Sequence, residues 1–290
     1  MTTLDTTTPG STPLGTAPGQ PSDYSLGTST SEYERLRYQA QIWESATERA
    51  LDRIDVKPGS RCLDAGSGPG VTMRQLAQRV GSQGQVVGVD VDEVLGRVSL
   101  ERLHADGHRQ CEFYAHDLLD DKPIPGAPYD VVYARLVLFH LPRRVEVLAR
   151  LWDAVAPGGH LVVHDYDLTA AGTAPALPSV AAVGDLVLDS FRAAGCEVRA
   201  GVLLPRWFGE AGVGAPDGTD VAGQLDRLAD AARMFEQVSR SLLPVAIARG
   251  VTTESAAEEL LGRLRDAAAA DPERPTLWPL LLASWKRKDA

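Results

Sequence analysis

Hydrophobic and polar residues alternate along the middle of the chain with the period of strands and of helices in turn. Short, almost continuously apolar runs predict five strands: Arg61–Asp64, Gln85–Val91, Cys111–Asp117, Tyr129–Arg135 and His160–Asp165. Segments of helical period between them predict helices near 70–80, 93–106 and 142–156. Runs such as VVGVDV have no polar face, which is typical of strands covered on both sides. This alternation predicts an α/β fold with a doubly wound, mostly parallel sheet.

The segments before this core have a different composition. Residues 1–22 are mostly Thr, Pro, Gly and Ser, with too little apolar surface to offset the entropy cost of ordering them. We therefore expect a disordered leader. Residues 23–57 carry apolar positions at helical spacing and predict a helical cap, after which the core covers 58–168.

Beyond the core the regular alternation is lost. Residues 169–290 predict Ala- and Leu-rich helices over 176–195 and 224–270, followed by the last strands of the sheet. The segment TLWPLLLASWKRK is ambiguous by periodicity. We favour an edge strand because the segment contains Trp278 and Pro279 and ends in the charged residues KRK.

Charge narrows the range of partners. The formal net charge of −10 disfavours nucleic acid and anionic membranes, because both must be held by neutralising phosphate groups. No window approaches the roughly 18 apolar residues of a membrane span, and residues 1–34 contain no basic residue, which excludes a secretory signal or transit peptide. We expect a cytoplasmic protein with no nucleic-acid or membrane partner, and a homodimer stays open.

A glycine-rich turn is the most informative motif. In Cys62–Gly70 a predicted strand runs into Gly66 and Gly68, where the backbone can approach a ligand closely, and then into a helix with free N–H groups. About 20 residues later Asp90 ends the next predicted strand, where a carboxylate can accept both hydroxyls of a ribose. The combination predicts a cofactor that contains adenosine.

Two details distinguish between such cofactors. The dinucleotide pattern G-x-G-x-x-G would require a glycine at position 71, which is Val71. Asp64, two residues before the first glycine, would repel a pyrophosphate but suits a cofactor that carries an ammonium and a sulfonium. The residues therefore favour S-adenosylmethionine over a nicotinamide cofactor.

The order of these motifs resembles a known family. The runs VKPGSRCLDAGSGPG, GSQGQVVGVDVD, HDLLD, YDVVYARLVLFHLP and PGGHLVVHDYD are similar to those of the class I S-adenosylmethionine-dependent methyltransferases, over residues 31 to about 168. The front of the chain is similar to a bacterial small-molecule branch whose N-terminal helices fold over the cofactor. The resemblance implies a Rossmann-like, seven-stranded sheet, a C-terminal helical insertion acting as a lid, and transfer of a methyl group from S-adenosylmethionine.

The resemblance also implies cofactor-binding residues. For the methionine part they are Gln39, Asp64, Gly66, Gly68, Ala134 and Arg135. For the ribose and the adenine they are Asp90, Val91, Asp117 and Leu118. In this scheme Asp64 orders the amino group and Asp117 accepts the exocyclic amine, while Gln39 is either a carboxylate contact or a solvated helix residue.

Candidates for chemistry lie after the fourth and fifth predicted strands. His140 is the candidate general base, because the resemblance places the acceptor pocket there and histidine takes up protons near neutral pH; a structural cap is the alternative. His164 and Asp165 are either a supporting pair or buried strand-end packing. We expect no metal ion, because Arg135 stands where metal-dependent relatives place a carboxylate.

Aromatic residues outside the common pattern are candidates for acceptor recognition, with core packing as the alternative: Trp43, Tyr166, Trp207, Phe208 and Phe235. Arg206 either holds an anionic group of the substrate or lies at the surface. The favoured function is methyl transfer to oxygen or nitrogen of a small-molecule acceptor in specialised metabolism. A cofactor-assisted cyclisation or elimination, a peptide or protein methyltransferase and a non-catalytic cofactor-binding subunit are the alternatives.

Overall fold

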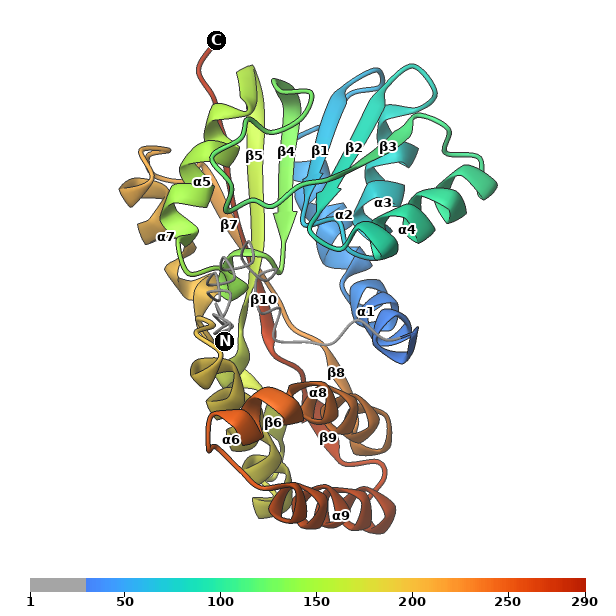
Figure 1. Ribbon diagram of the computed structural model, residues 1–290, viewed down its shortest axis with the longest axis vertical. Helices are drawn as coiled ribbons and strands as arrows, with labels where there is room; N and C mark the ends of the chain where they lie inside the picture. Colours follow the sequence, from blue (N-terminus) through green and yellow to red (C-terminus); the bar gives the residue numbers. More distant parts are fainter. Residues whose placement is uncertain (1–29) are drawn as a thin grey trace, which may run out of the picture.

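The computed structural model describes residues 30–290, as a twisted sheet with helices on both faces and a helical arm beyond one end of the strands (Figure 1). The leader expected over 1–22 lies outside the described residues. None of the described helices is both long and apolar enough to cross a membrane.

The main sheet of the described chain has seven strands in the order β3-β2-β1-β4-β5-β10-β7. Five of them run parallel: β1 (Arg61–Ala65), β2 (Gln85–Asp90), β3 (Cys111–Ala115), β4 (Tyr129–Arg135) and β5 (Val155–Asp167). The strand β10 (Leu280–Arg287) is antiparallel to both of its neighbours, β5 and β7 (Gly218–Ala222). The predicted doubly wound, mostly parallel sheet is confirmed.

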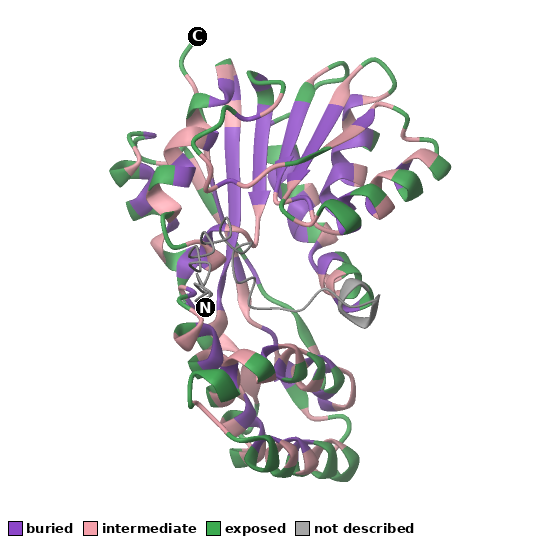
Figure 2. Cartoon of the chain, viewed as in Figure 1, coloured by how far each residue is buried: buried purple, intermediate pink, exposed green. Residues whose placement is uncertain are grey.

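Helices cover both faces of this sheet. One face packs against α2 (Glu44–Arg53), α3 (Val71–Val80) and α4 (Glu93–Ala105), and the other against α5 (Arg144–Asp153) and α7 (Ala200–Glu210). Figure 2 shows the strands between them buried along most of their length. Such two-sided burial explains why the strand sequences are apolar without alternation.

The arm holds three helices, α6 (Pro178–Ala193), α8 (Leu228–Ala248) and α9 (Glu254–Ala270), which share one apolar cluster. Beside them lies a small antiparallel sheet in the order β6 (Gly172–Thr173), β9 (Pro275–Leu277) and β8 (Leu225–Arg227). The helix α1 (Thr30–Ile42) lies between the main sheet and the arm, on the side of β1, β2 and β3 (Figure 1).

Three predictions about elements need correction. The last long strand, β10, is not an edge strand, because β7 pairs with its outer side and forms the edge. The helix predicted over 224–270 is divided into α8 and α9, and its first residues form β8. The strand β5 begins at Val155 rather than at His160, since a register shift near Tyr129 lets the Pro-Gly-Gly segment remain in the strand.

Candidate functional site

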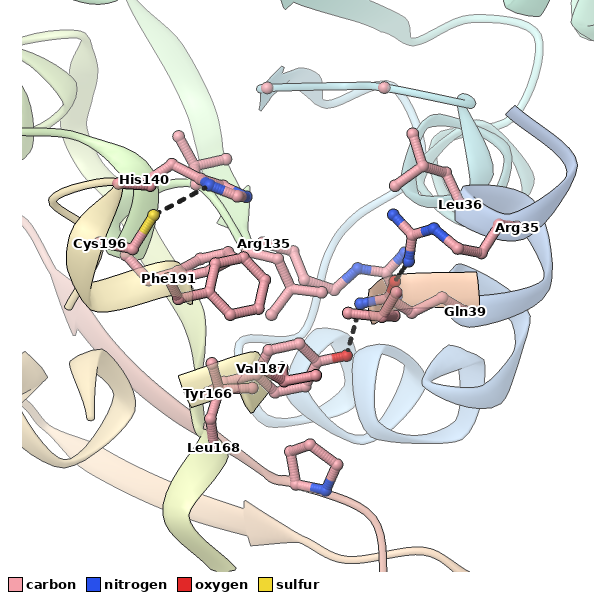
Figure 3. A pocket seen from close by; sticks show the side chains of 18 of the residues that line it. Arg35, Leu36, Gln39, Arg135, His140, Tyr166, Leu168, Val187, Phe191 and Cys196 are labelled. Carbon is pink, nitrogen blue, oxygen red and sulfur yellow. Dashed lines mark hydrogen bonds between the residues drawn. The ribbon is translucent and has the colours of Figure 1, made fainter. Parts of the chain in front are cut away.

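A cavity of about 1400 Å³ lies where β1, β2, β4 and β5 end, between the main sheet, α1 and the arm (Figure 3). In doubly wound sheets the neighbours β1 and β4, whose connections run to opposite faces, leave a crevice at the carboxyl ends of the strands. The volume exceeds the roughly 300–1000 Å³ of a pocket that holds one drug-sized ligand. The cavity therefore has room for two ligands side by side.

The glycine-rich loop forms one wall of this cavity. Gly66 has φ +72° and Gly68 has φ +46°, both in the left-handed region that favours glycine. A Cβ at Gly66 would overlap the Val137 side chain, whereas a Cβ at Gly68 would meet no atom within 4 Å. The loop is therefore packed from behind and open in front, as a backbone that cradles a ligand must be.

Asp90 holds the same loop from the end of β2. Its Oδ2 accepts a hydrogen bond from the Gly68 N–H at 2.8 Å, and its Oδ1 accepts one from the Asp92 N–H at 3.0 Å. Burial raises the pKa of this carboxyl, and hydrogen bonds from backbone N–H groups oppose the rise. Asp90 also lines the cavity, so the lone pairs that the backbone leaves free can accept hydroxyl groups of a ligand.

The next strand ends carry the residues expected around an adenine. Val91, which is 49% exposed, lines the cavity together with Asp117 and Leu118. The Asp117 Oδ1 accepts a hydrogen bond from the Leu119 N–H at 2.8 Å, which fixes the turn after β3. This end of the cavity combines apolar side chains with a carboxylate.

Asp64 and Ala134 do not line the cavity, in contrast to the other residues that the resemblance implies. Ala134 is fully buried in β4, next to the cavity residue Arg135, and its place beside the methionine part stays a prediction. Asp64 is 2% exposed beneath the glycine loop, and its Oδ2 has no hydrogen-bond partner in the described part of the chain. Burial raises its pKa to about 7, against the attraction of Arg135. The ordering of an amino group by Asp64 stays a prediction.

On the α1 side, a hydrogen-bond network connects the helical cap to β5. The Arg35 Nη1 donates to the Gln39 Oε1 at 2.6 Å, and the Gln39 Nε2 donates to the Tyr166 Oη at 2.8 Å. The Trp43 Nε1 donates to the same oxygen at 2.8 Å. Gln39 is therefore a partly buried network residue on the cavity wall, and the solvated alternative is wrong.

Arg135 connects β4 to the same cap. Its Nη1 donates to the Thr47 Oγ1 at 2.9 Å and to the Ala40 carbonyl at 3.4 Å. The arginine also lines the cavity. It therefore places a positive charge near Asp64 and Tyr166, where it opposes the rise in pKa that burial causes in both groups.

His140 lies on the cavity wall in the 3-10 turn η1 (Leu138–His140). Its Nδ1 is 3.7 Å from the Cys196 Sγ, and its ring centroid is 3.6 Å from that of Phe139. Burial lowers the pKa of His140 to about 3, and Arg35 contributes in the same direction. The imidazole is therefore neutral at physiological pH and a weak base.

His164 and Asp165 are buried in β5 and do not line the cavity. The Asp165 Oδ2 accepts from the Phe139 N–H at 3.1 Å, which anchors the turn that carries His140. Burial raises the pKa of Asp165 to about 8 and lowers that of His164 to about 3. Within residues 30–290, no group of three His, Cys, Asp or Glu side chains could hold a metal ion.

The arm supplies an apolar wall, of which only Phe235 is among the residues predicted from the sequence. Its residues come mainly from α6 and α8: Val180, Val187, Leu188, Phe191, Met234, Phe235 and Val238. The periodicity of 176–195 predicts a helix with an apolar face, but a period does not show whether that face meets another helix or a ligand. Tyr166 and Phe235 line the cavity, where acceptor recognition requires them to be.

The helix α7 carries no cavity residue. Trp207 and Phe208 are buried in the cluster that packs beneath β5, so the lid interpretation is wrong for both. Arg206 is exposed, forms an ion pair with Glu210 at 2.6 Å and does not line the cavity, in agreement with the surface alternative.

Comparison with known proteins gives a consistent result. Residues 62–159 match a family described as "Methyltransferase domain". Methyltransferase str3 of Strobilurus tenacellus is 30% identical over 151 residues, which cover 52% of this chain and 51% of that protein. Demethylmenaquinone methyltransferase of Bacillus cereus is 32% identical over 122 residues, 42% of this chain and 50% of that protein. The chain thus spans about half or less of the length of these curated relatives.

Solved structures extend the likeness in fold. A putative methyltransferase from Bacillus halodurans has a TM-score of 0.59 at 16% identity and covers 85% of this chain and 100% of its own. A second structure is that of phosphoethanolamine N-methyltransferase 2 of Haemonchus contortus in complex with phosphomonomethylethanolamine and S-adenosylhomocysteine. Its TM-score is 0.52 at 17% identity, and the match covers 90% of this chain and 57% of that chain. At this identity the likeness concerns the fold alone.

Proposed function

We propose that this chain, which belongs to the class I S-adenosylmethionine-dependent methyltransferases, methylates an oxygen or nitrogen of a small, largely apolar acceptor. We further propose that the acceptor is a molecule of specialised metabolism and that the arm acts as the lid over it.

The observation that carries this proposal is a single cavity with two chemically different halves. One half is built from the glycine loop, Asp90 and Asp117, and the other from the apolar faces of α6 and α8. A volume of about 1400 Å³ leaves room beside a nucleoside cofactor for an acceptor of similar size.

The residues of the first half fit S-adenosylmethionine. The cradle in front of Gly68 and the acceptor lone pairs of Asp90 suit the amino-acid and ribose parts. The unpartnered Oδ2 of Asp64 lies beneath the loop, where a positively charged ligand would lower the carboxyl pKa again. When bound, the cofactor supplies a methyl group on a positively charged sulfur.

The protein's own contribution is mainly position and exclusion of water. Asp90 and the glycine loop would fix the cofactor, while the walls from α1 and the arm would hold the acceptor beside it. His140 is a poor proton acceptor, with a pKa of about 3. We therefore propose that the acceptor reacts without proton transfer to His140, whose role is to line the acceptor space.

The names of two relatives support an apolar acceptor. A relative from Oryza sativa is called 24-methylenesterol C-methyltransferase 2, and the Bacillus cereus relative is named after demethylmenaquinone. The acceptors in both names are largely hydrocarbon, as is the wall formed by α6 and α8.

The test combines purified protein, labelled S-adenosylmethionine and fractionated apolar metabolite extracts. We expect the label in an extractable product heavier by one methyl group, and none with Asp90→Ala, because that variant frees the glycine loop and removes the ribose acceptor. Asp153→Ala, at an exposed position on α5, is the matched control and should keep full activity. A new product with unchanged methyl count and unconsumed cofactor would instead establish the non-methylating alternative.

A further inference from the structure

Tyr166 holds a fixed position between the two halves of the cavity. Its ring makes edge contacts with Trp43, at 6.0 Å between centroids and 63° between planes, and with Phe139, at 6.3 Å and 66°. The residue is 5% exposed and lines the cavity near the end of β5 (Figure 3). A side chain clamped in this way has little freedom to turn its hydroxyl elsewhere.

Two donors occupy the phenolic oxygen. The Trp43 indole N–H can only donate, and it reaches the Tyr166 Oη at 2.8 Å. The Gln39 Nε2 also donates to it at 2.8 Å, and the amide cannot be reversed because Arg35 donates to its Oε1. Both lone pairs of the Tyr166 oxygen are therefore engaged.

The hydroxyl proton of Tyr166 must consequently point to another acceptor. Among the residues that the structure describes, the Tyr166 hydroxyl donates to no protein oxygen or nitrogen, and the remaining direction opens on the cavity. Burial raises the pKa of this phenol, so the proton is retained at neutral pH. Gln39 and Trp43 thus act as positioning residues that aim a donor at a ligand.

The charges around this donor favour a negatively charged partner. Arg35 and Arg135 both lie on the same part of the wall, and His140 is uncharged. Asp165, which precedes Tyr166 in the sequence, is buried, does not line the cavity and has a raised pKa. Asp185 on α6 is exposed and lies on the arm side of the cavity. Asp90 ends β2 and Asp117 follows β3, and at least two strands separate each of these from β5.

We propose, building on the function proposed above, that the acceptor carries an acidic hydroxyl, a phenol or an enol, which binds as an oxyanion hydrogen-bonded to Tyr166. The proton of the acceptor leaves to solvent on binding. A lone pair of the oxyanion forms the new O–C bond as the S–C bond of the cofactor breaks, and the electron pair of that bond stays on sulfur. The arginines and Tyr166 replace a general base by stabilising the ionised acceptor.

The test uses 4-nitrophenol as the ionisable probe and its methyl ether, 4-nitroanisole, as a neutral probe of the same shape. Both are titrated into protein saturated with S-adenosylhomocysteine, and the absorbance of the phenolate reports ionisation. We expect bound 4-nitrophenol to ionise at lower pH than the free phenol. Tyr166→Phe should weaken phenolate binding about tenfold or more and leave 4-nitroanisole binding unchanged.

Two further variants separate this role from a merely structural one. Gln39→Leu keeps the Tyr166 hydroxyl but frees one lone pair, so phenolate binding should fall less than in Tyr166→Phe. Tyr114→Phe, on the exposed side of β3, should match the wild type. Equal weakening of both probes, an unchanged Tyr166→Phe variant, or no preference of the wild type for the phenolate would overturn the inference.

Binding of S-adenosylhomocysteine is measured first for each protein. Absence of binding to the wild type would refute the proposed function itself. Loss of cofactor binding in Tyr166→Phe alone would show that the hydroxyl contacts the cofactor's carboxylate, which would overturn the assignment to the acceptor.

Discussion

At the end of β1 the chain turns through Gly66, and this residue shows how strongly single positions constrain the site. Its φ of +72° disfavours any side chain, and the space that a Cβ would need is filled by Val137 from the segment after β4. The backbone of the loop can therefore approach a ligand only because position 66 has no side chain.

Substitution of this glycine should weaken cofactor binding strongly. In Gly66→Ala the new methyl group must push Val137 or the loop itself, so we expect at least a tenfold loss of affinity for S-adenosylhomocysteine by isothermal titration. Gly212→Ala is the control, because Gly212 has a similar φ of +76° but open space around it, far from the cavity. Equal affinity of the two variants would contradict this description of the loop.

Asp64 gives a prediction about pH. Because burial raises its pKa to about 7 in the folded protein, the folded state holds a proton that the unfolded state releases near pH 4. The contribution of Asp64 to the free energy of unfolding is therefore present at low pH and is lost as the pH rises from about 4 to 7. Between pH 5 and pH 8 this loss should be on the order of 2 kcal/mol.

Asp64→Asn removes this titration. In the absence of cofactor, the variant should gain stability relative to the wild type between pH 5 and pH 8, as measured by urea unfolding. Comparing the two proteins at each pH cancels the contributions of His140 and His164, whose lowered pKa values act in the opposite direction. A stability difference that is the same at both pH values would show that Asp64 is not buried as described.

At the scale of elements, the helical cap is attached to the sheet by polar contacts as well as by packing. Thr47 on α2 is fully buried and accepts the hydrogen bond from Arg135, while α1 reaches β5 through Gln39 and Tyr166. These bonds connect the cap to the ends of β4 and β5, where the cavity opens. The cap should therefore be sensitive to changes that leave the main core intact.

Thr47→Val preserves shape but removes the acceptor for the Arg135 guanidinium. A hydrogen bond to a charged group contributes about 1.5–3 kcal/mol, so we expect local destabilisation of that size. Hydrogen exchange should accelerate over α1 and α2 and stay unchanged over α5 and α7. Thr219→Val, at an exposed position on β7, should have no effect, and faster exchange throughout the molecule would argue against a separately attached cap.

The same elements show how far sequence reasoning reaches. The strands from β1 to β5 could be predicted because two-sided burial makes each an apolar run bounded by turns. The position of β10 could not, because its partner β7 has the sequence GTDVA, which contains no pattern of a strand. Short sequence motifs are enough to predict the glycine-rich loop, Asp90 and Asp117 as cofactor-binding candidates. The donor role of Tyr166 could not be predicted, because it depends on side chains more than 120 residues away in the sequence.

At the scale of the whole molecule, the main sheet and the arm contribute different chemistry to one cavity. Three acids, Asp64, Asp90 and Asp117, lie in or just after β1, β2 and β3, while Arg35 and Arg135 lie near Tyr166. This separation suits a positively charged cofactor next to an acidic acceptor. The apolar arm adds the volume in which that acceptor can be held.

A crystal structure of the protein with S-adenosylhomocysteine tests this account most directly. We expect the adenine between Val91 and Leu118, the ribose on Asp90, and the sulfur facing the apolar wall of α6 and α8 across from Tyr166. A cofactor bound outside this cavity, or one whose sulfur faces away from the arm, would contradict the account.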